Sequence, residues 1–166
     1  MPPEPVIREA RPEDASAIRR LLDALDALHR QRVPGAFGGA PGQPASVDFV
    51  AELLKSEHST VLVADVGSIV GVACAVLRAP RASAAFSAAR WAVLDSLVVD
   101  PAWRRHGIGR RLVQSIESWA ASCDVSYIEL NVYAFNVEAR RFYEALGYLP
   151  VRTVLRKRCA QAAKGD

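Results

Sequence analysis

Two glycines, Gly107 and Gly109, stand between an apolar segment and an amphipathic one. The apolar segment, residues 93–99, is rich in β-branched residues and predicts a buried strand. In the amphipathic segment, residues 108–121, apolar residues recur at the three- and four-residue spacings of a helix. Glycine adopts backbone conformations closed to other residues and lets N–H groups approach a ligand. The sequence therefore predicts that a strand, a glycine turn and a helix start meet at one point.

This predicted turn has the properties of an anion-binding site. The first N–H groups of a helix have no partner within it, and the helix dipole makes that end positive. Four arginines add formal charge around the turn: Arg104, Arg105, Arg110 and Arg111. We therefore expect the turn to bind a phosphate or a pyrophosphate.

Two common phosphate-binding motifs fit the turn poorly. A P-loop continues from its glycines into Lys and then Ser or Thr, whereas Gly109 is followed by two arginines. A dinucleotide-binding turn has a third glycine where Leu112 stands, and an acid about twenty residues later. Glu129 has that spacing, but the strand pattern continues beyond it.

Length and composition predict one domain, residues 1–166, of an ordinary globular kind. The chain is 51% hydrophobic and 23% charged, and about two thirds of its unfolded surface would be buried. The N-terminus has no signal-peptide pattern, and no apolar run is long enough to span a bilayer. Three scattered cysteines predict neither a disulfide framework nor a metal site, and suggest a reducing compartment, the cytoplasm. The net charge of +3 is too small to indicate nucleic-acid binding, but it suits a ligand with several phosphates.

The order of predicted elements is that of an α/β protein. Strands are expected at residues 6–10, 60–64, 69–77, 93–99 and 126–132, with a hairpin turn at 65–68. Helices are expected after Pro12, after Ser46 or Asp48, over 108–121, and from a cap at Asn136 to Ala145. Loops are expected at 33–44 and 78–90, and an extended basic segment at 152–158. His29 and His58 lie near predicted helix ends and are interpreted as surface residues without a catalytic role.

A second informative stretch, residues 130–148, contains Asn136, then Phe142-Tyr143, then Leu-Gly-Tyr. The pattern Arg-x-x-Gly-x-Gly after an apolar strand, followed by this stretch, resembles the two signatures of GNAT-type N-acetyltransferases, in the family's order. The resemblance covers most of the chain. The pair of signatures is specific, whereas neither half alone would be.

The resemblance implies an α/β (α+β) GNAT fold with a mixed, mostly antiparallel central sheet. This sheet is flanked by helices and splayed between its fourth and fifth strands, and coenzyme A sits in the opening. Acetyl-CoA is then the co-substrate, with no metal. The implied cofactor-binding residues are Leu97, Val98, Val99, Arg104, Arg105, His106, Gly107, Ile108, Gly109, Arg110 and Asn136.

The implied reaction moves an acetyl group from acetyl-CoA to a primary amine by direct attack in a ternary complex. Tyr143 matches the family's thiol-facing tyrosine and is expected to act as the general acid. Asp95 is the candidate base, directly or through water, with a salt-bridge or capping role as the alternative. Strand alternation predicts that Asp95 shares a face with Leu97 and Val99. The developing oxyanion is expected to meet a strand N–H near Val98 or Val99.

Two other functions stay open at this level. The chain could be a module that senses acyl-CoA without turning it over, or a nucleic-acid-binding protein that uses its arginine clusters. The acceptor amine is not readable from the sequence, and no membrane partner is expected. A homodimer through a sheet edge or the C-terminal strand also stays open.

Overall fold

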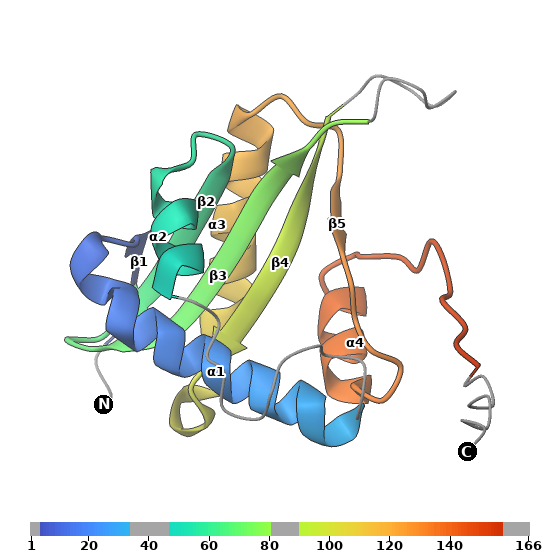
Figure 1. Cartoon of the computed structure of the whole chain (residues 1–166), viewed down its shortest axis with the longest axis horizontal. Helices are drawn as coiled ribbons and strands as arrows, with labels where there is room; N and C mark the ends of the chain where they lie inside the picture. The colour runs from blue at the N-terminus through green and yellow to red at the C-terminus, as the bar shows by residue number, and fades with distance from the viewer. Residues whose placement is uncertain (1–3, 34–46, 81–89, 158–166) are drawn as a thin grey trace, which may run out of the picture. The chain divides into compact units, whose positions relative to one another are not determined.

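The computed structural model describes residues 4–33, 47–80 and 90–157 (Figure 1). The predicted loops at 33–44 and 78–90 and the end of the basic segment lie largely outside these residues. The strands are β1 (Val6–Glu9), β2 (Ser59–Asp65), β3 (Ile69–Arg78), β4 (Trp91–Val99) and β5 (Ile128–Leu130). The helices are α1 (Ala15–Arg32), α2 (Val47–Lys55), α3 (Ile108–Ser122) and α4 (Val137–Glu144), with short 3₁₀ turns η1 (Pro12–Asp14) and η2 (Pro101–Trp103).

The five strands form one sheet in the order β1-β2-β3-β4-β5. The first three pairings are antiparallel, and β4 pairs with β5 in parallel. This confirms the predicted mixed, mostly antiparallel sheet. The hairpin between β2 and β3 is also where it was predicted, with Gly67 at φ +93° in its turn.

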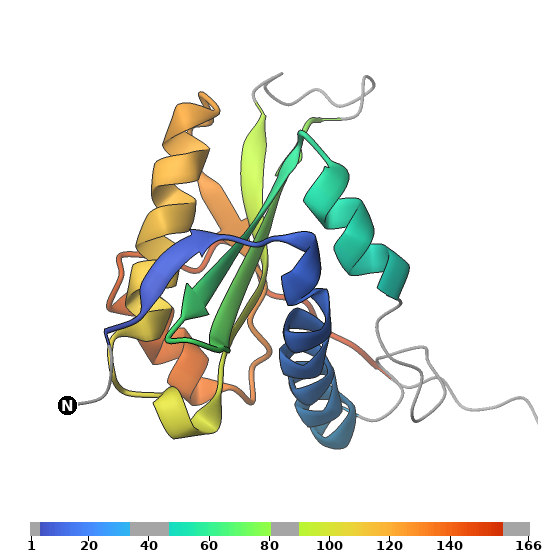
Figure 2. The ribbon, with the colours of Figure 1, turned by 90° about the vertical axis from the view of Figure 1, so that its left-hand side faces the viewer.

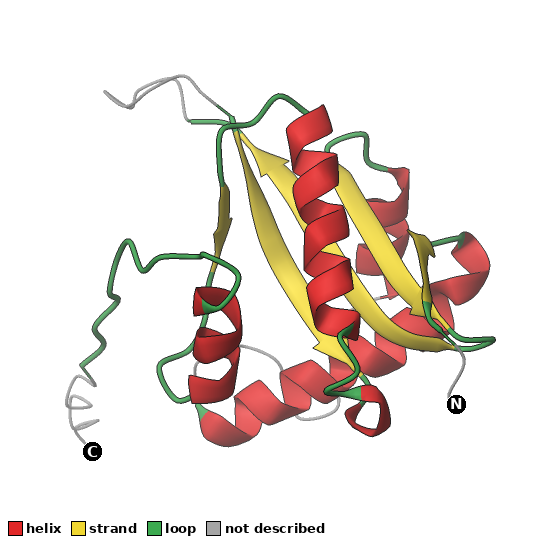
Figure 3. Ribbon diagram, turned by 180° about the vertical axis from the view of Figure 1, so that it is seen from behind, coloured by secondary structure: helices red, strands yellow, loops and turns green. Residues whose placement is uncertain are grey.

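Helices cover both faces of the sheet. Figure 2 shows α1 and α2 on one side of the strands and α3 on the other, and Figure 3 shows α3 lying along the sheet from behind. On the α1 face, the core is formed by buried residues of α1, α2 and the three central strands, namely Ile18, Leu21, Leu22, Val50, Val61, Val63, Ile69, Val72, Cys74 and Val98. On the other face, α3 buries the apolar residues predicted from its periodicity, Ile108, Leu112, Val113, Ile116 and Ala120.

The chain falls into two compact units, residues 1–135 and 136–166. The first contains the whole sheet with α1, α2 and α3, and the second contains α4 and the C-terminal segment. No helix among the described residues is both long and apolar enough to cross a membrane.

The last strand is shorter than the sequence predicted. The strand expected over residues 126–132 is ordered as a strand only at Ile128–Leu130, because only these residues pair with β4.

Arg11 is a poor N-cap residue, yet the start of η1, which leads into α1, is well fixed. The Arg11 N–H donates to Asp14 Oδ2 at 2.8 Å. The carboxylate of Asp14 thus does the capping that the Arg11 side chain cannot do.

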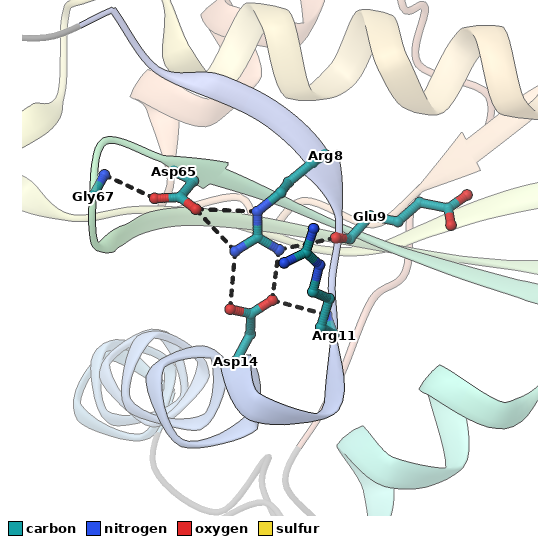
Figure 4. A network of polar contacts seen from close by, with 6 residues as sticks. All are labelled: Arg8, Glu9, Arg11, Asp14, Asp65 and Gly67. Carbon is teal, nitrogen blue, oxygen red and sulfur yellow. Dashed lines mark hydrogen bonds and ion pairs between the residues drawn. The ribbon is translucent and has the colours of Figure 1, made fainter.

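A charged network ties the first strand to the β2–β3 hairpin (Figure 4). The Arg8 guanidinium binds both carboxylate oxygens of Asp14, at 2.7 and 3.0 Å, and Asp65 Oδ2, at 2.9 and 3.1 Å. Asp65 also accepts from the Gly67 N–H at 2.8 Å. The hydrogen bonds from Arg8 lower the pKa of both carboxyl groups and raise that of the guanidinium. Three chain segments are therefore held by one side chain.

Replacing Arg8 by Met is expected to lower the free energy of unfolding by about 2–3 kcal/mol, because it leaves two partly buried carboxylates without their partner. Urea denaturation measures this. The matched control is Arg111→Met, since Arg111 pairs with the highly exposed Glu4 at 3.3 Å, where little change is expected.

The network also predicts an acid dependence with a definite sign. The lowered pKa values of Asp14 and Asp65 add stability above their unfolded-state pKa, which is lost as pH falls through the folded-state values. The wild-type protein should therefore lose stability below about pH 4 more steeply than Arg8→Met. Parallel acid profiles for the two proteins would contradict this role of Arg8.

Candidate functional site

The central strand has an open edge beyond its first half. β4 runs to Val99, but its parallel pairing with β5 covers only Ala92–Leu94. Figure 1 shows the two strands diverging from that point. This is the splay that the family resemblance implied. The far half of β4 therefore lacks a strand neighbour on its β5 side within the described residues.

The register decides which main-chain groups reach this open edge. The Asp100 N–H donates to the Val70 carbonyl at 2.8 Å, in register with the pairing of Val99 with Gly71. In an antiparallel ladder, alternate residues turn their N–H and C=O groups to the same neighbour. Val98 therefore turns its main chain to β3, while Leu97 and Val99 turn theirs to the opening. Three strand residues were expected to bind the cofactor through their main chain. Leu97 and Val99 face the opening, as this role requires, whereas Val98 faces β3.

The glycine turn directly follows η2 and precedes α3. Gly107 has φ +77° and is the N-cap of α3, so the need for glycine predicted at this position is confirmed. Arg105 also has a positive φ, +67°, which is uncommon for a residue with a side chain. The N–H groups of residues 107–110 donate to none of the described residues. The turn thus presents a short row of main-chain donors at the positive end of α3.

Close packing of α3 on the sheet sets where this turn lies. A Cβ atom placed on Gly71 would lie 3.2 Å from Leu112 Cδ1 and 3.3 Å from Ile108 Cγ2. The absence of a side chain at Gly71 lets the first turn of α3 approach β3. The donor row is therefore fixed relative to the end of β4.

The arginine side chains of the turn differ in their contacts. Arg104 Nε donates to the Val99 carbonyl at 3.1 Å, so this side chain is bound to the end of β4. Arg105, His106 and Arg110 are exposed, and His106 lies beside Trp103 with ring centroids 6.4 Å apart. The exposed arginines keep a positive field over the turn.

Asp95 lies in a β-bulge of β4. Ser96 pairs with Cys74 and Leu94 pairs with Ala75, so Asp95 has no partner on β3. Val98 belongs to the α1-side core, whereas Val99 pairs with Gly71, which faces α3. The bulge interrupts the alternation that the sequence analysis assumed.

The charge of Asp95 acts on Cys74 and on Asp26 of α1, which places it on the α1 side. The prediction that Asp95 shares a face with Leu97 and Val99 is therefore wrong. Asp95 is exposed, and Ser96 Oγ donates to its Oδ2 at 3.2 Å. An exposed carboxylate thus lies two residues from the main-chain groups of Leu97.

A group of ring contacts between α1 and the segment after β5 was not predicted from the sequence. His29 lies 5.2 Å from Tyr133 and 6.3 Å from Phe135, measured between ring centroids, and the latter two rings are stacked 5.6 Å apart. Burial lowers the pKa of His29, while Asp26 acts against this shift. In the sequence, the three-residue spacing of Asp26 and His29 predicts only that both lie on one face of a helix. The aromatic partners of His29, Tyr133 and Phe135, follow more than a hundred residues later.

The second unit contains the other two predicted site residues. Asn136 caps α4, since its Oδ1 accepts from the Ala139 N–H at 3.1 Å. Tyr143 is half-buried, with Phe142 and Tyr148 at ring-centroid distances of 5.1 and 5.6 Å. Burial raises the pKa of Tyr143 to about 12, so its hydroxyl is protonated at neutral pH. No group of three or more potential metal ligands is found in the described part of the chain.

The chain is similar to proteins of known family and known structure. The model of the acetyltransferase (GNAT) family matches residues 22–148. No curated protein matches the chain. Among solved structures, a mutant of the BH1408 protein from Bacillus halodurans is similar at TM-score 0.84 and 26% identity, over 93% of this chain and 99% of that one.

Two further solved structures are informative. A transcriptional regulator from Bacillus halodurans has TM-score 0.73 and 26% identity, over 93% of this chain and 99% of that one. The aminoglycoside N-acetyltransferase AAC(6')-Iy in complex with CoA has TM-score 0.69 and 20% identity, over 93% and 100%. At that identity the likeness shows the fold alone. Because the family match covers most of the chain, including both signatures, the protein belongs to the GNAT family of acetyltransferases.

Proposed function

We propose that the protein is an acetyl-CoA-dependent N-acetyltransferase that acts on an amine by direct attack. The observation that carries this proposal is that the first unit presents two sets of outward main-chain groups, one at the end of β4 and one at the start of α3. The donors of residues 107–110 suit a diphosphate. The outward N–H and C=O of Leu97 and the outward N–H of Val99 suit the amides of a pantetheine arm. Coenzyme A has both parts, separated by an extended chain.

The proposed reaction uses groups at the open edge of the first unit together with Tyr143 of the second unit. The amine nitrogen forms a bond to the thioester carbon, and the carbon–sulfur bond breaks. The outward N–H of Leu97 or Val99 stabilises the negative charge that develops on the carbonyl oxygen. Asp95 accepts the proton that the nitrogen loses, directly or through water, and returns it to solvent. Tyr143 donates a hydrogen bond to the departing sulfur, and the proton that completes the thiol comes from solvent.

The assignment of Asp95 is supported by its position. The bulge places the carboxylate outside the regular ladder, exposed and hydrogen-bonded to Ser96. An amine with a pKa near 10 must lose a proton before or during attack, so an accessible acceptor is required. Cys74 is not a candidate nucleophile for an acyl-enzyme step, because it is buried and burial raises its pKa to about 12.

A screen of amines with acetyl-CoA, reading out free thiol, tests the proposal. We expect thiol release that depends on both the amine and the protein, together with an acetylated amine product in equal amount. Asp95→Asn should lower the rate with every amine while leaving affinity for coenzyme A unchanged. Coenzyme A binding without thiol release from any amine would contradict the enzymatic function.

A non-catalytic sensor of acyl-CoA is the second candidate. It is favoured by the likeness to a protein described as a transcriptional regulator. The same screen separates the two functions, because a sensor binds acetyl-CoA tightly and leaves the thioester intact.

A further inference from the structure

The sheet ends at β1, and the outer edge of this strand has no strand neighbour within the described residues (Figure 1). The Ala10 N–H donates to the Val61 carbonyl at 2.8 Å, which continues the ladder between β1 and β2 by one residue. Main-chain groups alternate in direction along an antiparallel strand, so residues 6, 8 and 10 turn theirs to β2. Ile7 and Glu9 therefore turn their N–H and C=O groups to the outer edge.

The outer edge offers a particular series of donors and acceptors. Neither the N–H nor the C=O of Ile7 has a partner in the described part of the chain. The Glu9 N–H is likewise unpaired, but the Glu9 carbonyl already accepts from Arg8 Nη1 at 3.0 Å. Pro5 has no N–H, and its carbonyl points outward, because a trans peptide sets it opposite to the Val6 N–H. The series is an acceptor at Pro5, a donor with an acceptor at Ile7, and a donor at Glu9.

This series is complementary to itself when it is turned end to end. Antiparallel pairing about a two-fold axis at Ile7 sets Ile7 opposite the partner's Ile7, and Glu9 opposite the partner's Pro5. The two Ile7 residues exchange two hydrogen bonds, and each Glu9 N–H reaches a Pro5 carbonyl. The groups without a mate in this register are the N–H that proline lacks and the Glu9 carbonyl that Arg8 occupies. No polar group of the edge is then left unsatisfied.

The groove between β1 and α3 shows which side chains meet across this axis. It has a volume of about 450 Å³, with Ile7 on one side and Arg111 on the other. Ile7 pairs with Ala64, which lies beside Gly71 on the α3 side of the sheet. Alternation along β1 places Glu9 on the same side. In the paired edge, Ile7 gains an apolar neighbour in the partner's Ile7, and Glu9 lies at the partner's groove.

The charges at the groove are complementary as well. Arg111 Nη1 lies 3.3 Å from the Glu4 carboxylate, so this guanidinium reaches the residue next to Pro5. The partner's Glu9 lies opposite Pro5, which brings a second carboxylate to the same guanidinium. Glu9 makes no ion pair with any residue that the structure describes. The two-fold axis repeats this contact, so each copy both gives and receives one.

We propose that the outer edge of β1 binds the same edge of a second copy, antiparallel about a two-fold axis at Ile7, to form a homodimer. The two five-stranded sheets then continue into one another. The contact uses the β1 edge of both copies, so it closes at two and does not propagate. The opening beside β4 lies towards the other end of the strand order and is left free. The inference is independent of the proposed function.

Sedimentation equilibrium of the full chain over a range of concentrations tests the assembly. We expect a monomer–dimer equilibrium with a dissociation constant of about 1–100 µM, because one strand pair with few side-chain contacts makes a small interface. Ile7→Pro should weaken the dimer at least tenfold, since it removes the donor at the axis. Its ring would face outward, as that of Pro5 does, so the ladder to β2 is kept. The matched control, Ile7→Val, keeps the N–H and should dimerise like the wild-type protein.

Cysteine cross-linking tests the register. Residue 7 lies opposite its own copy with Cα atoms about 5.5 Å apart, which a disulfide can span. Val6 lies opposite the partner's Arg8, so the two copies of residue 6 are about 7–8 Å apart, too far for a disulfide. Under mild oxidation Ile7→Cys should form a covalent dimer well above the wild-type background. Val6→Cys should stay at that background, although Val6 is 60% exposed.

Charge reversal tests the contact between Glu9 and the partner's Arg111. Glu9→Arg sets like charges against each other and should weaken the dimer about tenfold at low salt, less at high salt. Adding Arg111→Glu to the same chain reverses both charges and should restore most of the lost affinity. An additive, unrestored double variant would show that the two side chains do not meet.

The remaining outcomes are as definite. A monomer at every concentration, or a dimer as strong in Ile7→Pro as in the wild-type protein, would exclude this edge as the interface. Equal cross-linking of Val6→Cys and Ile7→Cys would exclude the register. Melting temperatures identify a variant that fails to fold, and if Ile7→Pro does so, the cross-linking comparison decides. None of these results bears on thiol release, so the proposed function stands or fails by its own screen.

Discussion

Gly107→Pro is expected to weaken coenzyme A binding at least a hundredfold. Gly107 has φ +77°, whereas proline fixes φ near −65° and has no N–H. The substitution removes one donor and forces the turn to change, so neighbouring donors lose their common direction. Two lost hydrogen bonds to a charged group cost about 3 kcal/mol or more, which is a factor of a hundred or more in affinity. Calorimetry with coenzyme A measures it.

Two variants make this test specific for the turn. Gly107→Asn should bind coenzyme A within a few-fold of wild type, because asparagine tolerates the left-handed conformation. Gly109→Glu should lose binding for another reason, since it adds a negative charge in the first turn of α3 against a diphosphate. A glutamate there suits the helix dipole, so the fold should be at least as stable. Unchanged affinity in Gly107→Pro and Gly109→Glu would remove the turn from the site.

Tyr143→Phe is expected to lower kcat about a hundredfold while changing coenzyme A affinity little. The ring and its contacts with Phe142 and Tyr148 are kept, and only the hydroxyl is lost. General acid catalysis contributes about 10²–10⁴-fold, and the lower end applies here. The pKa of Tyr143 is about 12, so complete proton transfer to a thiolate with a pKa near 8.5 is uphill. Hydrogen bonding to the developing thiolate should supply most of the effect.

The leaving group gives a second measurement for Tyr143. With acetyl thioesters of progressively more acidic thiols, the difference between wild type and Tyr143→Phe should shrink, because a better leaving group needs less help. A constant difference across the series would show that the hydroxyl acts elsewhere. Equal kcat values for the two proteins would exclude Tyr143 from the mechanism.

The sequence was most informative where local chemistry decides the structure. Gly107 in a left-handed conformation, Asn136 as a helix cap and the apolar stripe of α3 all depend on neighbours within a few residues. The splay between β4 and β5 came from the family resemblance. The short length of β5 did not, because it depends on which residues of a distant strand pair with it.

Asp95 and His29 show where reading the sequence was insufficient. A β-bulge leaves no mark in the pattern of apolar residues when it lies at a polar position, so alternation assigned Asp95 to the wrong face. His29 was interpreted as an ordinary surface residue because its aromatic neighbours, Tyr133 and Phe135, are distant in the chain. Long-range pairing decides both positions, and one sequence does not contain that information.

The bulge at Asp95 has a consequence for how this scaffold could change over time. Leu94 faces α3 and Ser96 faces α1, so joining them directly would still give regular alternation on both sides. Excising Asp95 should therefore leave the hydrophobic interior intact, and the shortened chain should melt near the temperature of the parent while losing acetyl transfer. Because the core does not depend on the side chain at position 95, other side chains can replace it while the fold is kept. The chemistry of the site can therefore change at this position without a change of fold.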